Sequence, residues 1–442
     1  MTTTKKIVLL VVMLSYFVTA IDSSIVVTGL THIAADLQLD QVTLSWVQNV
    51  YVLSFGGFIL LGGRFSDAYG RKLVLDISLV LFGIGSLLAG AATTGWVMIT
   101  ARLMQGVGAS MLAPTSMALL VDYFTGTERI KAISWYSSMS GLGSCCGLLL
   151  GGFLASFYTW RIGFYINVPI MLVMIVLSNR VFKNKPNLHS KFDLSGACTS
   201  VAAVFYLVYA IDGAANSLPW LIAAALLTVI FIKIEKTASL PVMPLGLFHH
   251  ATRCNAYIIR LLFVGAMMGF WFFLSEFMQH VFGFSPLLAG MAFLPLTLTT
   301  FIGAIKVPAL VVEYGNKRVL CAGICCQIVG FLLLLLLDKD SSYLWGIGLP
   351  TLFLGIGQGL EIAPLTNLGV TGVDSSDAGA ASGVVNAAHQ IGGSVGLSLM
   401  VSFSAGAADM SGAFHTAMLV GAVISSAMLI FWLRLPSDKP VL

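Results

Sequence analysis

Ionisable side chains inside long apolar stretches are the residues of this sequence that could do chemistry. Asp22 lies near the middle of such a stretch, and a charge in hydrocarbon costs several kcal/mol, so Asp22 is a functional candidate. Desolvation favours the neutral form of a carboxyl, so Asp22 could hold a proton or neutralise a cationic ligand, and the two events would compete. The alternative is that Asp22 only forms packing hydrogen bonds with its helix neighbours.

A buried cation offers a counterpart to this acid. Arg102 lies within the fourth long apolar stretch of the chain. A lone guanidinium there would be prohibitively unstable, so Arg102 must pair with a carboxylate, with backbone carbonyls or with water. Such a pair could take part in proton transfer, or it could be a structural ion pair.

Two glutamates are candidates for a second protonation site. Glu361 lies deep in the twelfth apolar stretch, whereas Glu276 lies near the end of the ninth, where it could reach water instead. Arg260 and Lys306 lie within about two turns of the ends of their stretches, so we expect both to snorkel to the membrane surface, with pairing to an acid as the alternative. His389 is predicted to be a packing histidine in preference to a proton relay.

Apolar stretches long enough to cross a membrane must position these residues. About 20 apolar residues span the hydrocarbon core, and fourteen stretches meet or come close to this length. The predicted fold is therefore an all-α polytopic membrane protein. The predicted spans are 7–30, 43–63, 73–92, 96–121, 132–157, 163–182, 194–212, 218–234, 254–277, 286–311, 318–337, 343–369, 378–402 and 412–433.

The composition supports the same class of protein. The 442 residues are 58% hydrophobic and 10% charged, whereas soluble domains carry about 25% charged residues. The net charge of +4 is spread in pairs between apolar runs, so the sequence has no basic stripe to bind nucleic acid. The seven cysteines are expected to be buried free thiols, and we expect neither a metal nor a cofactor.

Basic residues in the loops predict the orientation. Lysine and arginine resist translocation, and the even-numbered loops and both tails hold eighteen of them, against Arg161 and Lys339 in the other loops. Both termini are therefore expected in the cytoplasm. The start of the chain resembles a signal peptide, but its apolar run continues to about Gly29, so we expect an uncleaved first helix.

An internal repeat divides the chain into two halves. The segment 67–72 is echoed by 313–318, and Gly106-x-Gly108 is echoed by Gly357-x-Gly359. We predict an N-terminal six-helix bundle over 1–182, an inserted helix pair with its linkers over 183–250, and a C-terminal six-helix bundle over 251–442. Two repeated halves around a central site are typical of transporters, in which the halves rock to alternate access.

Several motifs resemble those of the major facilitator superfamily, and specifically of its fourteen-helix drug:proton antiporters. The segments 63–72, 20–27 and 102–109 are similar to the signatures of the loop after the second helix, of the first helix and of the fourth helix. The fifth predicted helix resembles the antiporter motif, although Leu148 stands where proline is usual. The glycines of this last motif are Gly143, Gly147, Gly151 and Gly152.

The resemblance implies roles for these residues. It implies that Arg102 takes part in proton transfer near Asp22. With the acids named above, the candidates for proton coupling or substrate binding are Asp22, Arg102, Glu276 and Glu361. The resemblance also implies a conformational gate, in which Asp67 would begin the third helix and latch helix ends together with Arg64 and Arg71. The gate residues are Gly63, Arg64, Asp67, Gly70 and Arg71. The glycines of the fifth helix would allow a neighbouring helix to pack closely.

The expected function is export of hydrophobic and cationic drugs, such as quaternary ammonium compounds, dyes and fluoroquinolones, in exchange for protons, through the membrane of a bacterial cell. The chain would act as a monomer, without a cofactor. The first alternative is a transporter of the same fold for one antibiotic, sugar or siderophore. A membrane enzyme would need a nucleophile and base or a histidine-rich metal cluster, and the histidines are scattered. A channel or receptor is disfavoured because the repeated bundle has no large ligand-binding or signalling domain.

Overall fold

The computed structural model describes residues 2–182, 193–211, 217–238, 241, 243–373 and 378–436, and this part of the chain is helical, with no strand. The elements in chain order are α1 (Thr3–Leu37), α2 (Gln41–Tyr69), α3 (Arg71–Gly90), α4 (Gly95–Tyr123), α5 (Gly126–Phe157), α6 (Trp160–Tyr165), α7 (Asn167–Val181), α8 (Leu194–Ile211), α9 (Leu218–Thr237), η1 (Leu245–His249), α10 (Ala251–His280), α11 (Pro286–Ala292), α12 (Leu294–Tyr314), α13 (Asn316–Leu334), η2 (Leu344–Gly348), α14 (Leu349–Gly369), α15 (Ala378–Ser404) and α16 (Met410–Leu433).

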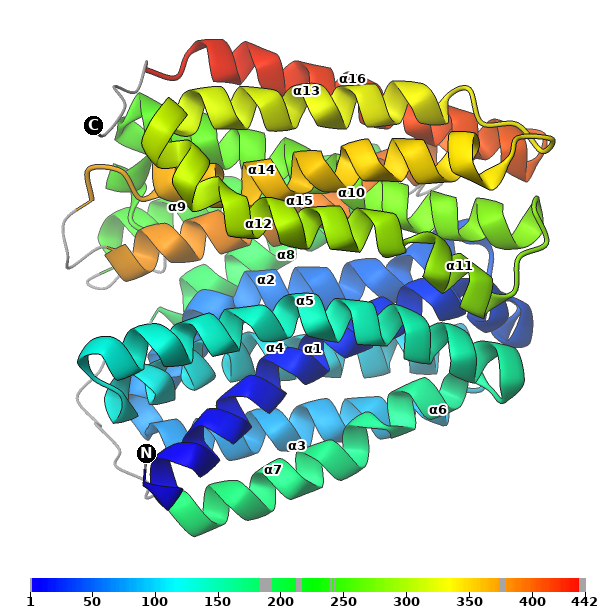
Figure 1. The fold of residues 1–442 in the computed structure, drawn as a ribbon. Helices are drawn as coiled ribbons and strands as arrows, with labels where there is room; N and C mark the ends of the chain where they lie inside the picture. The colour runs from blue at the N-terminus through cyan, green and yellow to red at the C-terminus, as the bar shows by residue number, and fades with distance from the viewer. Residues whose placement is uncertain are drawn as a thin grey trace. The chain divides into compact units, whose positions relative to one another are not determined.

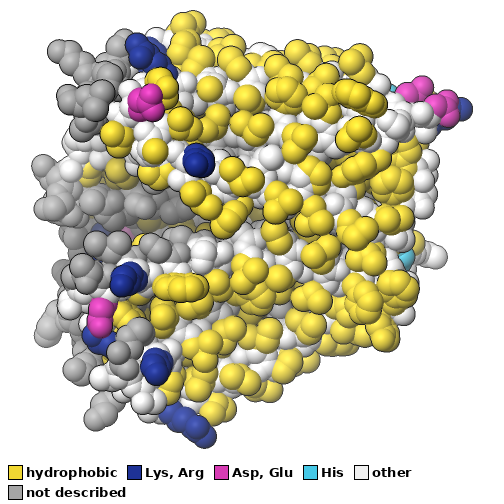
Figure 2. All heavy atoms as spheres, in the orientation of Figure 1, with side chains coloured by type: hydrophobic (Ala, Val, Ile, Leu, Met, Phe, Trp, Pro, Cys, Tyr) yellow, Lys and Arg dark blue, Asp and Glu magenta, His cyan; other side chains and the backbone are white. Residues whose placement is uncertain are grey.

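Every predicted span coincides with helix. Among the described residues, 12 helical stretches are long and apolar enough to cross a membrane. The remaining two predicted spans, 132–157 and 378–402, correspond to α5 and α15. The prediction of an all-helical polytopic fold is confirmed. Figure 2 shows why a bilayer suits it, because apolar side chains cover the sides of the helices and charged ones gather mainly toward the helix ends.

The chain forms two compact units, which we describe separately. The first unit comprises Met1–Phe205, Ala224–Val242 and Ser285–Gly290. Within it α1 packs along α5, and α4 packs between α2 and α3 (Figure 1). α6 and α7 form one spanning stretch that breaks at Ile166, so that Asn167 begins a new helix beside α3 and α1.

The second unit comprises Tyr206–Ala223, Met243–Phe284 and Met291–Leu442. Within it α10 packs against α15 and α16, while α14 packs against α12 and α13 (Figure 1). The domain boundaries drawn from the sequence stay a prediction, and residues 183–192 at one of them lie outside the described part of the chain.

The two units repeat the same local geometry. Gly70 joins α2 to α3 with φ 95°, and Gly315 joins α12 to α13 with φ 82°. Residues other than glycine rarely adopt this backbone conformation. A methyl group placed on Gly108 of α4 would lie 2.9 Å from the Ser78 carbonyl oxygen of α3. One placed on Gly357 of α14 would lie 2.9 Å from the Gly323 carbonyl oxygen of α13. Small residues therefore set equivalent helix crossings in both units.

Candidate functional site

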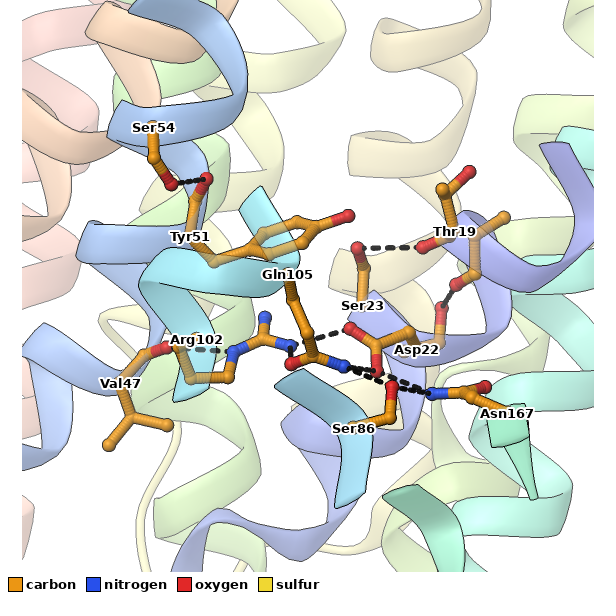
Figure 3. Close-up of polar contacts among 12 residues, drawn as sticks. Thr19, Asp22, Ser23, Val47, Tyr51, Ser54, Ser86, Arg102, Gln105 and Asn167 are labelled. Atoms are coloured by element: carbon orange, nitrogen blue, oxygen red, sulfur yellow. Dashed lines mark hydrogen bonds and ion pairs between the residues drawn. The ribbon is translucent and has the colours of Figure 1, made fainter. Parts of the chain in front are cut away.

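The central feature of the first unit is a buried ion pair between α1 and α4. Asp22 is 1% exposed and Arg102 is 2% exposed. A guanidinium nitrogen of Arg102 donates to Asp22 Oδ2 over 2.5 Å (Figure 3). Two ions leave water at a cost of several kcal/mol each, so the pair requires close geometry and further hydrogen bonds.

Those further bonds come from three side chains around the carboxylate. Gln105 Nε2 donates to Asp22 Oδ1 over 2.9 Å, and Asn167 Nδ2 donates to the same oxygen over 2.8 Å. The Ser86 hydroxyl oxygen accepts from Gln105 Nε2 over 2.8 Å and from Asn167 over 3.3 Å, which ties the two amides together (Figure 3). Asp22 thus has a charged partner on one oxygen and two neutral donors on the other.

The guanidinium of Arg102 is held on its other sides as well. Its Nε donates to the Val47 carbonyl oxygen over 3.1 Å, and a terminal nitrogen donates to Gln105 Oε1 over 2.8 Å. Its carbon lies 4.2 Å from the centroid of the Tyr51 ring, within the range of a cation–π contact. Arg102 would therefore keep partners from α2 and α4 if Asp22 became neutral.

This arrangement can couple protonation to helix packing. A proton on Asp22 would cancel the charge that attracts Arg102, and it would place a donor where Gln105 and Asn167 now donate. The four side chains come from α1, α4 and the first residue of α7. Proton binding would therefore loosen contacts among three helices.

Three members of this network, Gln105, Asn167 and Ser86, were not predicted from the sequence. Gln105 lies three residues after Arg102, so both project from one face of α4, and this spacing could have identified it. Asn167 lies two residues before a proline, next to the helix break, which is a weaker signal. Ser86 resembles any other serine in an apolar helix, and nothing in the sequence distinguishes it.

The second unit holds a buried acid of a different kind. Glu361 on α14 is 0% exposed, and neither carboxyl oxygen has a hydrogen-bond partner among the described residues. Arg260 of α10 is close enough to interact with it electrostatically. A guanidinium nitrogen of Arg260 donates to the Ile362 carbonyl oxygen over 3.1 Å, next to Glu361 in the chain.

The other ionisable residues singled out in the sequence, Arg260, Lys306, His389 and Glu276, differ in how far they are buried. Arg260 is 6% exposed, so the prediction that it snorkels to the surface is wrong; α14 offers its guanidinium a carbonyl partner inside the unit. Lys306 is exposed and His389 is half-buried. Glu276 is 5% exposed near the end of α10 and belongs to neither the Asp22 network nor the surroundings of Glu361.

The gate residues lie at the junction of α2 and α3. Asp67 lies in the last turn of α2, so the prediction that it begins the third helix is wrong, because Gly70 with its positive φ ends α2 and separates the two helices. Arg71 forms an ion pair with Asp67, and its Nε lies 3.4 Å from Oδ2 of Asp122 on α4. Gly63 and Arg64 lie half-buried on α2, within two turns of this cluster. The cluster links the ends of three helices.

The glycines of α5 are places of close helix packing. Methyl groups on Gly143 and Gly147 would lie 2.8 and 2.7 Å from the carbonyl oxygens of Phe17 and Ile21 on α1, and one on Gly151 would lie 2.7 Å from Ile25 Cα. A methyl group on Gly152 would lie 2.6 Å from the Pro286 carbonyl oxygen of α11. α5 and α1 therefore pack backbone to backbone along the helix that carries Asp22.

The sequence of this chain is similar to that of a known family and of several known transport and resistance proteins. The profile of the Major Facilitator Superfamily matches residues 12–397. The puromycin resistance protein pur8 of Streptomyces alboniger is 32% identical over 412 residues, which cover 90% of this chain and 82% of that protein. The cephamycin export protein CmcT of Amycolatopsis lactamdurans is 33% identical over 415 residues, covering 90% and 85%.

Further similarity extends to a multidrug resistance protein and to solved structures. The multidrug resistance protein Stp of Mycobacterium tuberculosis (strain CDC 1551 / Oshkosh) is 31% identical over 409 residues, covering 90% of this chain and 76% of that protein. The crystal structure of a mutant of the nucleoside transporter NupG has a TM-score of 0.72 at 14% identity, covering 97% of this chain and 99% of that one. The latter similarity concerns the fold alone.

Proposed function

The chain belongs to the major facilitator superfamily, and we propose that it exports hydrophobic and cationic compounds from a bacterial cell in exchange for protons. The family assignment made from the motifs is confirmed, and the protein is a multi-pass membrane transporter and not an enzyme. Export is supported by the relatives, whose names describe resistance to or export of antibiotics. Quaternary ammonium compounds, dyes and fluoroquinolones are the proposed substrates.

The observation that carries proton exchange is the buried pair of Asp22 and Arg102. Its carboxylate is accessible to a proton only if the pair opens, and opening separates helices that are packed together. A proton entering the cell down about 100 mV contributes about 2.3 kcal/mol from the potential alone, which can drive export without nucleotide hydrolysis. Both termini are proposed to be cytoplasmic, and the unit of function is proposed to be the monomer.

The test is transport into proteoliposomes that contain the purified chain. With an acidic lumen, ethidium should accumulate inside while protons leave, and collapse of the pH gradient with an ionophore should stop accumulation. Accumulation that continues unchanged after the collapse would rule out proton exchange. Empty liposomes, and liposomes carrying Asp22→Asn protein, separate transport from dye binding.

A second candidate is export of one antibiotic. The relatives pur8 and CmcT are named for puromycin and cephamycin respectively, and each name specifies one compound. Expression of the chain in a sensitive strain should distinguish the two functions. Growth protected against several unrelated dyes and biocides favours the broad exporter, whereas protection against one antibiotic favours the specific one.

A further inference from the structure

Two of the buried acids, Asp22 and Glu361, stand in opposite electrostatic surroundings. Asp22 receives three donors, one of them a guanidinium, at 2.5 to 2.9 Å. Glu361 receives none among the described residues, although its side chain is 0% exposed. Ionisation of Glu361 costs more free energy than ionisation of Asp22, because a carboxylate in a low-dielectric interior needs hydrogen-bonded or charged partners.

The helices around Glu361 bring few compensating groups. Within electrostatic range are Arg260 of α10 and the Cys326 thiol of α13, and His389 of α15 lies near the same guanidinium. α12 carries Lys306, which is exposed. These helices surround α14 in the second unit (Figure 1).

Arg260 is directed to the backbone beside Glu361 and not to its carboxyl group. A guanidinium nitrogen donates to the carbonyl oxygen of Ile362, whereas neither oxygen of Glu361 accepts a hydrogen bond from the described residues. On the α13 side the Glu361 side chain packs closely, since a methyl group on Gly323 would lie 2.7 Å from its Cγ. The buried carboxyl therefore has a cation near it, but no hydrogen bond from the described residues.

We propose that Glu361 is a proton-binding site, that it carries its proton in the conformation seen here, and that Asp22 is ionised at the same time. Release transfers the proton from the Glu361 carboxyl to water, and the Arg260 guanidinium then turns from the Ile362 carbonyl to pair with the new carboxylate. The role of this site in transport rests on the proposed proton exchange, but its protonation does not. The two units would then hold one loaded and one empty proton site.

Infrared difference spectroscopy of the purified full chain tests the protonation directly. A protonated carboxyl gives a carbonyl-stretch band that an ionised one lacks. We expect this band in the wild type at neutral pH and expect Glu361→Gln to remove it. Asp22→Asn and Glu313→Gln should leave it, since Glu313 is an exposed acid of the same unit.

Two further variants keep the result decisive. Glu276→Gln tests the other buried acid of the second unit and should leave the band, whereas Glu361→Asp should retain a band at a shifted frequency. Glu361→Gln should unfold at the temperature of the wild type, because a neutral side chain replaces a neutral one. Absence of the band in the wild type, or its persistence in Glu361→Gln, would overturn the proposal.

The outcome is separable from that of the proposed function. If the band behaves as expected but ethidium transport does not depend on the pH gradient, the proton site at Glu361 is supported and proton exchange is contradicted. If transport is driven by protons but the band does not depend on Glu361, proton exchange is supported and the proton site at Glu361 is contradicted. The number of protons released per ethidium transported, compared between Glu361→Gln and wild-type protein, then measures the contribution of Glu361 to transport. We expect this number to be lower in the variant.

Discussion

Asp22 on α1 and Arg102 on α4 meet over 2.5 Å at a depth where each side chain is at most 2% exposed. The sequence separation is 80 residues, so the contact fixes how two distant helices of the first unit pack. Because the carboxylate also accepts from Gln105 and Asn167, the ion pair is one part of a larger polar network.

Asp22→Asn should cost stability as well as coupling. The variant leaves the Arg102 charge buried without an ionised carboxylate to balance it, and removal of one member of a buried pair costs about 3–5 kcal/mol. Thermal unfolding should occur at a lower temperature, and proton release on ethidium binding should fall. Asp36→Asn is the matched control, since Asp36 pairs with Arg161 at an exposed position of the same helix.

The double variant Asp22→Asn with Arg102→Gln separates the two effects. It removes both charges, so we expect most of the lost stability to return while proton release stays low. A double variant as unstable as the single one would show that the charge of Arg102 is not the source of the instability.

Asn167→Ala should weaken the polar network around Asp22. The variant removes a hydrogen bond of 2.8 Å to the Asp22 carboxyl group, and a hydrogen bond to a charged group contributes about 1.5–3 kcal/mol. Thermal unfolding should therefore occur at a lower temperature. Asn179→Ala, on the same helix but bonded to Lys72 near its end, should lower the unfolding temperature less.

Gly147→Ala should weaken the packing of α1 on α5. The added methyl group would lie 2.7 Å from the Ile21 carbonyl oxygen, so backbone must shift, and overpacking typically costs about 1–3 kcal/mol. We expect a lower unfolding temperature and slower transport, with a larger effect for Gly147→Leu. Gly246→Ala, where no atom lies within 4 Å of the new methyl group, should behave as the wild type.

Gly70→Ala should strain the junction of α2 and α3. A φ of 95° is unfavourable for alanine, and a residue in such a region costs about 1–3 kcal/mol. The Gly315→Ala variant should lose a similar amount in the second unit, because Gly315 has a φ of 82°. If Gly406→Ala, which has open space and no such φ, destabilises as much, the strain argument is wrong.

The fold was predictable because hydrocarbon imposes a simple rule. A helix satisfies its backbone hydrogen bonds internally, so every long apolar run had to be helical, and each predicted span coincides with helix. The repeat was visible in the sequence because both helix junctions require glycine. Gly70 and Gly315 have a positive φ, which few other residues adopt. The position of Asp67 was misjudged because glycine, and not the acid, marks the end of α2.

The site was predictable only in part. Charged residues in apolar runs stand out, so Asp22, Arg102 and Glu361 were predicted as candidates from the apolar sequence around them. Their partners were not, because hydrogen bonds between helices depend on how the helices are rotated, which apolar side chains of similar size do not encode. Ser86 could be recognised only after α3 was placed beside α7, and Asn167 had only the weak signal of the nearby proline. Arg260 was misplaced for the same reason, since its carbonyl partner is on α14.

The most direct test of proton exchange follows both fluxes in one set of proteoliposomes. Ethidium uptake and lumenal pH should be recorded together, with the lumen acidic and the membrane potential clamped. We predict that ethidium enters as the lumenal pH rises, in a fixed ratio, and that Asp22→Asn lowers both rates together. Ethidium uptake at the full rate with no movement of protons would contradict the account.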